Sequence, residues 1–238
     1  MEHPSNQTVS IEIIGYISSC FKEKFATPRQ PGLAPSARAR LTLVEPFNRR
    51  EMIRGLETFS HVWVQFIFHQ VVADGWKTTV RPPRLGGSER KGVLATRSPH
   101  RPNHIGLSAV KLEDIDLSDG VALILSGVDL LDGTPVIDIK PYLPISDCPE
   151  GATEGWSDSA FAALHVRFTE SADDFCRDYR RRTGNDLGKL ISEVIRTDPR
   201  PASQRITRKE FGMLLWDVNV RWRMEDDTVC VVVGCEQI

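Results

Sequence analysis

The segment GLSAVKLEDIDLSDGVALILSGVDLLDGTPVIDI, residues 106–139, contains three short runs of β-branched and other apolar residues separated by Gly, Asp, Ser and Pro. Runs of this length between turn-forming residues are typical of neighbouring β-strands. The same pattern extends to earlier parts of the chain. The predicted strands are Ile11–Ile17, Ala39–Val44, His61–His69, Gly92–Thr96, Gly106–Leu112, Val121–Leu125 and Pro135–Ile139. The first two-thirds of the chain therefore predict a mainly β fold, either a small barrel or a sandwich.

The last third of the chain has a different pattern. Pro, Gly and acidic residues between positions 144 and 155 indicate a linker. Beyond it we predict a strand, two helices and a hairpin, at Phe161–Phe168, Ala172–Arg182, Leu187–Thr197, and Met213–Met224 with Val229–Cys235. We expect a β-barrel domain over residues 1–146 and a smaller α+β domain over residues 156–238. No predicted strand leads into a glycine-rich turn and a long helix, which argues against a doubly wound dinucleotide-binding fold.

Composition narrows the class of protein. The chain has 238 residues and a formal net charge of −2, which argues against a surface that binds nucleic acid everywhere. Its five cysteines are scattered and form no C-x-x-C pair, so we expect reduced thiols, no zinc site and no disulfide framework. The first residues lack a signal-peptide pattern, and no apolar run is long enough to span a bilayer. A soluble, cytoplasmic protein is expected.

Cationic residues concentrate between Arg81 and His104. This stretch contains five arginines, one lysine and two histidines against one acid, and Pro and Gly interrupt it. Guanidinium groups on a stiff, turn-rich backbone favour an anion-binding surface, with a solvated loop as the simpler alternative. The candidates for contact with RNA are Arg81, Arg84, Arg90, Arg101, Arg200 and Arg221. For Arg200 and Arg221, the alternative is that ion pairs tie the small domain to the barrel.

Two short motifs carry further polar groups. Asp129 and Asp132, in the segment DLLDG, could bond to their own backbone, contact a polar ligand or bind a metal. No third carboxylate or histidine stands at ligand spacing, so no metal site is predicted. His69 and Gln70 follow an apolar strand. Small barrels often contact a ligand at such a position, although a purely structural histidine is also common there.

Several long motifs in order resemble one family. They are KFATPRQPG at 24–32, RGLETFSHVWV at 54–64, FHQ at 68–70, RPPRLGG at 81–87, KGVLATRSPHRPNHIGLS at 91–108 and LLDGTPVIDIKPYLP at 130–144. This series is similar to the tRNA adenine-37 N6-methyltransferase family, TrmO. The resemblance is dense over residues 11–145 and thinner through Asp198–Pro201 and Val218–Trp222. His104 departs from the family pattern, which has proline there, and Ser203 stands in place of a tyrosine.

The resemblance implies a small β-barrel that binds S-adenosylmethionine without a glycine-rich loop. It also implies a homodimer with the cofactor near the subunit interface. The implied reaction adds a methyl group to N6 of threonylcarbamoyladenosine at tRNA position 37, beside the anticodon. Carried over by motif, the cofactor contacts are Pro28, Arg29, Gln30, His69, Gln70, Arg97, Leu107, Asp129, Leu130, Leu131 and Asp132.

The target nitrogen of such a reaction belongs to a urea-like group, which is a poor nucleophile until it loses its proton. Asp138 and Tyr142, in the segment IDIKPY, are the candidates for the catalytic proton acceptor. Lys140, between them, could stabilise developing negative charge. Arg29 or Arg97 could hold the carboxylate of the cofactor.

Two other functions fit part of the pattern. A non-catalytic barrel that binds RNA through its basic loop would explain the arginines. It would leave Asp129, Asp132, Asp138 and the segment Pro28–Gln30 without a role, and the basic stretch has no aromatic residue other than histidine. A methyltransferase that acts on a small molecule would share the cofactor site and differ only in its substrate.

Overall fold

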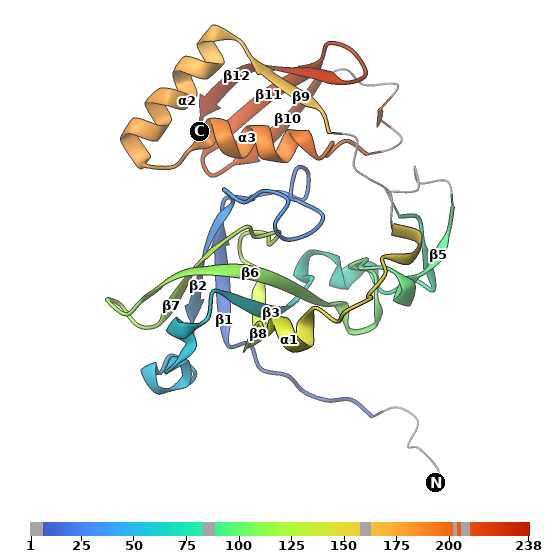
Figure 1. The fold of residues 1–238 in the computed structure, drawn as a ribbon, viewed down its shortest axis with the longest axis vertical. Helices are drawn as coiled ribbons and strands as arrows, with labels where there is room; N and C mark the ends of the chain where they lie inside the picture. The colour runs from blue at the N-terminus through green and yellow to red at the C-terminus, as the bar shows by residue number, and fades with distance from the viewer. Residues whose placement is uncertain (1–6, 83–88, 158–162, 202–203, 206–209) are drawn as a thin grey trace.

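The structure is a computed structural model that describes residues 7–82, 89–157, 163–201, 204–205 and 210–238. A β-barrel formed by the N-terminal part lies below a smaller unit of sheet and helices in Figure 1, and the C-terminus lies in the smaller unit. The prediction of a mainly β fold with a C-terminal α+β part is therefore confirmed. The bounds 1–146 and 156–238 for the two domains stay a prediction.

The barrel is closed by six antiparallel strands in the order β1-β2-β7-β6-β3-β8. Along β3 the burial alternates strictly, so that Val62, Val64 and Phe66 point into the barrel. This is the period-two pattern of a strand with one face in a core. The strands are β1 (Gly15–Ser19), β2 (Arg38–Leu43), β3 (His61–Ile67), β6 (Ile105–Asp116), β7 (Ala122–Ser126) and β8 (Pro135–Pro141).

Glycine is required where β3 meets β6. Gly106 lies opposite Phe66, and a Cβ at this position would come within 2.3 Å of Cζ of the Phe66 ring. Only a residue without a side chain lets the ring lie across the neighbouring strand. The Phe66 ring also contacts Phe68 edge-on, with centroids 5.0 Å apart. These aromatic rings close the end of the barrel next to the cavity described below.

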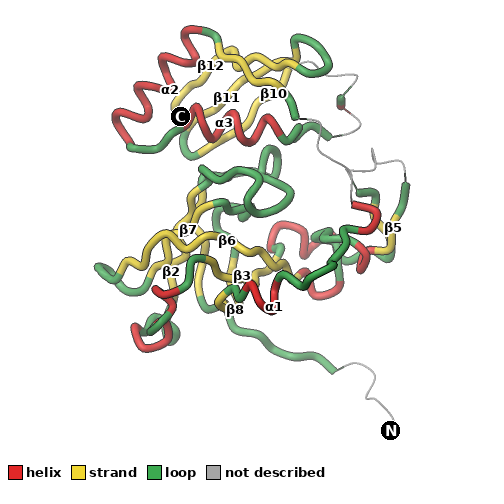
Figure 2. Tube along the Cα trace, in the orientation of Figure 1, coloured by secondary structure: helices red, strands yellow, loops and turns green. Residues whose placement is uncertain are grey.

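Short elements surround the barrel, as Figure 2 shows. They are η1 (Arg50–Ile53), η2 (Leu56–Thr58), η3 (His69–Asp74), β4 (Thr79–Val80), β5 (Lys91–Gly92), η5 (Val93–Ala95), η6 (Pro102–His104), α1 (Pro144–Asp147) and η7 (Gly155–Ser157). The predicted strand Gly92–Thr96 is wrong, because the chain turns into η5 after Gly92. Thr96 supports this turn through its backbone N–H and its hydroxyl, which both donate to the carbonyl oxygen of Val93.

The C-terminal unit consists of a four-stranded sheet and two helices. The sheet order is β10-β11-β12-β9, and β9 runs parallel to β12. The elements are β9 (His165–Phe168), α2 (Glu170–Thr183), α3 (Leu187–Arg196), β10 (Glu210–Leu215), β11 (Val218–Met224) and β12 (Val229–Gln237). Both predicted helices are confirmed. Thr169 caps α2 by accepting from the N–H of Ala172, and Asp186 caps α3 by accepting from the N–H of Lys189.

The predicted long strand Met213–Met224 is wrong. A turn at Trp216 and Asp217 divides it into β10 and β11, and Trp216 adopts a left-handed backbone with φ of 52°. The Asp217 carboxylate stabilises the turn, since it accepts from the Tyr179 hydroxyl at 2.7 Å and from the Gln237 amide at 2.6 Å. Among the described residues, no helix is long and apolar enough to cross a membrane.

Candidate active site

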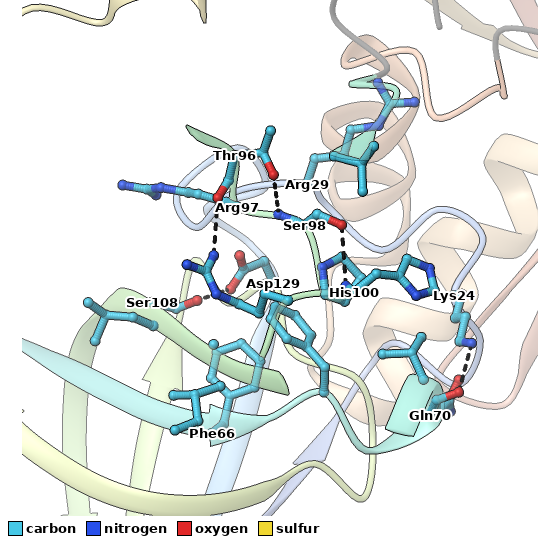
Figure 3. A pocket seen from close by; sticks show the side chains of 18 of the residues that line it. Lys24, Arg29, Phe66, Gln70, Thr96, Arg97, Ser98, His100, Ser108 and Asp129 are labelled. Carbon is cyan, nitrogen blue, oxygen red and sulfur yellow. Dashed lines mark hydrogen bonds between the residues drawn. The ribbon is translucent and has the colours of Figure 1, made fainter. Parts of the chain in front are cut away.

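A cavity of about 1170 Å³ opens at one end of the barrel. The described wall comes from the loop between β1 and β2, the end of β3 with η3, the segments around residues 77–82 and 90–108, and the loop between β7 and β8. Trp156 of η7 also lines the cavity. Figure 3 shows Ser108 and Asp129 at one end of the cavity and Lys24 and Gln70 at the other. Motifs far apart in the sequence thus meet in one place.

Nearly all of the predicted cofactor contacts line this cavity. They are Pro28, Arg29, Gln30, His69, Gln70, Arg97, Leu107, Asp129, Leu130 and Leu131. Asp132 does not line it, because its carboxylate accepts from the N–H of Ser19 at 2.9 Å and forms an ion pair with Lys22 at 2.9 Å. Asp132 therefore holds the loop between β7 and β8 against β1, and its direct contact with a cofactor stays a prediction.

Asp129 carries the only carboxylate among the described residues that line the cavity. The Ser108 hydroxyl donates to its Oδ1 at 2.7 Å. Burial raises the pKa of Asp129 to about 6, while the hydrogen bond from Ser108 and the charge of Arg97 act in the opposite direction. At neutral pH the carboxylate is charged and can accept hydrogen bonds from hydroxyl or ammonium groups of a ligand.

Hydrogen bonds connect the different parts of the cavity wall. Arg97 donates from Nη1 to Oε1 of Gln30 at 2.6 Å, which joins the two predicted cofactor motifs. Lys24 donates from Nζ to the carbonyl oxygen of Gln70 at 3.1 Å, which joins the β1–β2 loop to η3. The β1–β2 loop is therefore attached to the opposite wall at two points.

Two histidines add imidazole rings to the cavity wall. Burial lowers the pKa of His69, so its imidazole is uncharged at neutral pH. Nδ1 of His100 is buried and has no hydrogen-bond partner within the described part of the chain. Both side chains line the cavity. A buried polar atom without a partner is the kind of group that a bound ligand satisfies.

The charge of the cavity is strongly positive. Its described lining carries seven cationic side chains and one carboxylate, that of Asp129. The cationic residues are Lys24, Arg29, Lys77, Arg81, Arg90, Arg97 and Arg101. Low-dielectric walls lined by one sign of charge concentrate the field on a ligand of the opposite sign. The cavity thus suits a ligand with anionic groups, and Asp129 suits a polar or cationic group of that ligand.

The predicted RNA contacts divide into three groups. Arg81, Arg90 and Arg101 line the cavity, Arg221 is exposed on β11, and Arg84 lies outside the described residues. Arg200 is only 6% exposed, and its guanidinium donates to both carboxylate oxygens of Asp198, at 2.7 and 3.1 Å. Burial and the ion pair with Asp198 hold the Arg200 side chain inside the protein, and its contact with RNA stays a prediction.

The predicted catalytic pair lies outside the cavity. Asp138, on β8, accepts from the Gln65 amide at 3.2 Å and lies 3.9 Å from Nζ of Lys140. Tyr142 packs on the Trp63 ring at a centroid distance of 5.5 Å. Asp138, Tyr142 and Lys140 do not belong to the described lining of the cavity, and their catalytic role stays a prediction.

The departure at His104 changes a turn beside the cavity. His104 has a left-handed backbone with φ of 52°, which proline cannot adopt because its ring holds φ near −65°. Its buried ring is within hydrogen-bond distance of the carbonyl oxygen of Pro99, at 2.9 Å from Nδ1. In this chain the imidazole contact, rather than a proline ring, stabilises the turn that presents Arg101.

Sequence reasoning missed several lining residues with polar groups, among them Ser108, His100 and Trp156. Ser108 and His100 belong to the long motif at 91–108, which was the available signal. Trp156 follows the predicted linker, and its indole N–H donates to the carbonyl oxygen of Ala95 at 3.0 Å. No local pattern marks Trp156 as part of the site. Among the described residues, no three His, Cys, Asp or Glu side chains gather in a metal-binding group.

Comparisons with known proteins agree over almost the whole chain. The family model described as the tRNA-methyltransferase O N-terminal domain matches residues 16–148, and that of the TrmO C-terminal domain matches residues 162–238. A tRNA (adenine(37)-N6)-methyltransferase from Escherichia coli K12 is 48% identical over 219 residues, which covers 90% of this chain and 93% of that protein. The crystal structure of TrmO from Pseudomonas aeruginosa is 39% identical, with a TM-score of 0.82 over 98% of this chain and 99% of that one. This chain belongs to the TrmO family.

Proposed function

We propose that this protein transfers a methyl group from S-adenosylmethionine to N6 of adenine 37 in tRNA, and that its substrate carries the threonylcarbamoyl modification. The observation that carries the proposal is the cavity, in which one half-buried carboxylate, that of Asp129, stands among seven cations. The similar Escherichia coli protein bears the name tRNA (adenine(37)-N6)-methyltransferase. The name of a Pseudomonas aeruginosa relative, 47% identical over 216 residues, attributes S-adenosylmethionine-dependent methyl transfer to it.

The residues of the cavity fit this cofactor. The cavity volume of about 1170 Å³ is at the upper end of ordinary ligand sites, so a cofactor and a nucleoside can share it. Asp129 suits hydroxyl or ammonium donors, whereas Arg29 and Arg97 suit a carboxylate. When bound, S-adenosylmethionine supplies an electrophilic methyl group on a sulfonium. The chain contributes orientation, because an in-line displacement depends mainly on how the two reactants are held.

The positive charge of the cavity supports the threonylcarbamoyl substrate. That modification ends in a carboxylate, and Lys24, Lys77 and Arg101 offer countercharge along the wall. An unmodified adenine has no anionic group to use it. The same cations also suit the phosphates that flank position 37 in the anticodon loop, so tRNA affinity and substrate selectivity draw on one set of side chains.

The N6 proton must leave during the reaction. Within the described cavity, the groups able to accept a proton are the carboxylate of Asp129 and the imidazoles of His69 and His100. His69 is the best suited of these, because burial keeps it neutral and therefore able to accept. We assign the acceptor role to His69 in place of the pair Asp138 and Tyr142.

A homodimer and action in the cytoplasm complete the proposal. The apolar residues Leu143 and Ile145 after β8 are 43% and 94% exposed, which suits contact with a second subunit. Light scattering of the purified protein should give twice the chain mass. A monomer at micromolar concentration would contradict this part and leave the chemistry untouched.

The deciding experiment is an assay of methyl transfer with purified protein. One substrate is tRNA that carries threonylcarbamoyladenosine at position 37, and the other is a transcript of the same sequence without it. We expect methylation of the modified tRNA alone. Equal methylation of both would disprove recognition of the modification. S-adenosylhomocysteine is the product that S-adenosylmethionine leaves after it has given up its methyl group. Binding of tRNA without methyl transfer and without binding of S-adenosylhomocysteine would favour the non-catalytic RNA-binding barrel.

A further inference from the structure

The connection between β1 and β2, residues 20–37, is a long loop that forms part of the active-site cavity. It carries Pro28, Arg29 and Gln30 into the cavity wall, and it contains no helix or strand of its own. Connections longer than about 12–15 residues without secondary structure are uncommon and need support from outside. The contacts of this 20–37 loop therefore determine how well the wall is positioned.

The edge strand β10 holds the beginning of the loop. The N–H of Trp216 donates to the carbonyl oxygen of Cys20 at 2.8 Å, and Phe21 forms an antiparallel bridge with Leu215. The N–H of Leu214 donates to a carboxylate oxygen of Glu23 at 3.0 Å. Strand β10 thus uses its free edge to bind the loop rather than another strand of its own sheet.

Further contacts lie next to the cavity wall itself. The ring of Phe25 stacks on Phe211 of β10 with centroids 6.2 Å apart and an angle of 10° between the planes. Arg29, within the wall, donates from Nη2 to the carbonyl oxygen of Arg200 at 3.4 Å. The buried ion pair between Arg200 and Asp198 holds that carbonyl in place. The C-terminal unit therefore reaches within one hydrogen bond of the predicted cofactor contacts.

Helix α3 holds the end of the loop through one acidic side chain. Glu193 accepts from the backbone N–H of Ser36 at 2.7 Å through Oε2 and from the Ser36 hydroxyl at 3.0 Å through Oε1. The Glu193 side chain is only 14% exposed. Charge-assisted bonds of this kind, shielded from water, are stronger and more directional than neutral ones.

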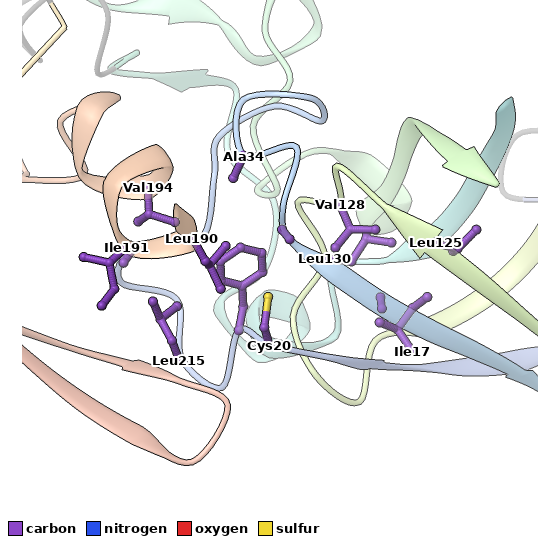
Figure 4. Close-up of a cluster of buried hydrophobic side chains, with 14 of the residues drawn as sticks. Ile17, Cys20, Ala34, Leu125, Val128, Leu130, Leu190, Ile191, Val194 and Leu215 are labelled. Atoms are coloured by element: carbon purple, nitrogen blue, oxygen red, sulfur yellow. The ribbon is translucent and has the colours of Figure 1, made fainter. Parts of the chain in front are cut away.

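Apolar packing and the barrel complete the attachment. Figure 4 shows Leu190 and Val194 of α3 beside Ala34 of the loop, within the buried cluster that also contains Val128 and Leu130. On the barrel side, the N–H of Gly32 donates to the carbonyl oxygen of Gly127 at 2.8 Å. The loop is thus held between α3 and the segment that leads to Asp129.

We propose that the C-terminal unit positions the cofactor-binding wall, and that Glu193 is a positioning residue for cofactor affinity. Glu193 lies outside the cavity and acts through Ser36 and the 20–37 loop. The inference rests on the proposed function, because it concerns the same cofactor site. It assigns to α3 and β10 a role in the chemistry of the barrel besides any contact with tRNA.

The test compares Glu193→Gln with Glu225→Gln. The second variant is a matched control, because Glu225 accepts from an exposed arginine, Arg167, at 2.9 Å in the turn before β12. Ser36→Ala removes only the hydroxyl bond and serves as a milder variant. For each protein, calorimetry gives the Kd for S-adenosylhomocysteine, and scanning calorimetry gives Tm. Steady-state assays at a saturating concentration of modified tRNA give kcat and the KM for S-adenosylmethionine.

We expect Glu193→Gln to raise the Kd about tenfold, and to raise the KM for S-adenosylmethionine while kcat at saturation stays within about twofold. Ser36→Ala should move the same quantities in the same direction by a smaller factor, and Glu225→Gln should leave them unchanged. A fall in Tm with Kd and KM at wild-type values would overturn the inference and leave the proposed function intact. Failure of the wild-type protein to bind S-adenosylhomocysteine would overturn both.

Discussion

Replacement of Asp129 by Asn tests the electrostatic design of the cavity. The change keeps the size of the side chain and lets Ser108 continue to donate to its oxygen, but it removes the charge. Since a hydrogen bond to a charged group contributes about 1.5–3 kcal/mol, we expect the variant to bind S-adenosylhomocysteine about ten- to hundredfold more weakly at pH 7.5. The replaced carboxylate is the only one in the described lining of the cavity.

The pH dependence of binding gives the sharper result. The pKa of Asp129 is raised to about 6, so the carboxyl group is protonated below that pH and charged above it. Protonation removes an acceptor, and therefore the wild-type affinity should rise with pH up to about 6 and then level off. One pH unit below the pKa, the affinity should be about tenfold lower than on the plateau. Asp129→Asn should abolish this step.

Two further variants test whether the pH step comes from Asp129. Ser108→Ala removes a hydrogen bond that lowers the pKa of Asp129, so the step should move to higher pH. Asp114→Asn is a control on β6, the strand that also carries Ser108. The exposed Asp114 carboxylate accepts from the N–H of Ile115 at 2.8 Å. It should bind like the wild type at every pH.

Calorimetric titrations with S-adenosylhomocysteine at pH 5, 6, 7 and 8 measure these affinities directly. His69 and Arg97 face the same cavity, and burial lowers the pKa of His69. The test therefore compares the pH dependence of affinity in the wild type with that in Asp129→Asn, because the contribution of His69 is common to both proteins. Parallel pH profiles for the two proteins would refute the reasoning that Asp129 binds the cofactor as a carboxylate.

Three other substitutions separate the roles assigned to charged residues. Arg200→Ala should reduce the free energy of unfolding by about 1.5–3 kcal/mol, since it removes the buried partner of Asp198 and leaves the more exposed Arg205 as its ion pair. The salt dependence of tRNA binding should stay as in the wild type. Arg101→Ala should instead make the slope of log K for tRNA against log salt concentration shallower by up to about one unit, while Tm stays as in the wild type. Filter binding over a range of salt concentrations measures this slope. Asp138→Asn should keep more than about a tenth of the wild-type kcat, because the carboxylate bonds to Gln65 outside the cavity; a loss of about 10²-fold or more would restore it as the proton acceptor.

The barrel strands were predictable because their burial alternates along the chain. The prediction His61–His69 contains the observed β3, His61–Ile67, and the prediction Pro135–Ile139 begins at the first residue of β8. Turn-forming residues bound both strands. The pattern failed at Met213–Met224, where apolar and polar residues continue to alternate through a tight turn. Only the contacts of Asp217 with distant residues mark that position as a turn.

The candidate site was predictable where its residues belong to a recognisable sequence motif. The segments around Pro28, His69, Arg97 and Asp129 all line one cavity. Spacing within a motif does not reveal which way a side chain points, and Asp132 turns instead to Ser19 and Lys22. That orientation depends on how the loop packs against β1.

Contacts between distant segments left no pattern to detect. Glu193 and Ser36 are 157 residues apart, and each stands in an ordinary sequence context. Arg200 and Asp198 lie two residues apart, but an exposed pair with this spacing would have looked the same in sequence. Burial of this pair depends on the packing of the two units, which local sequence does not determine.

The most direct test of the account is mass spectrometry of position-37 nucleosides in tRNA from cells with and without this protein. Deletion should remove N6-methylated threonylcarbamoyladenosine and leave the unmethylated threonylcarbamoyladenosine in its place. Restoration of the gene should return the methyl group, whereas a gene that encodes Asp129→Asn should return less of it. An unchanged nucleoside profile after deletion, in cells with no second protein of this family, would contradict the central claim.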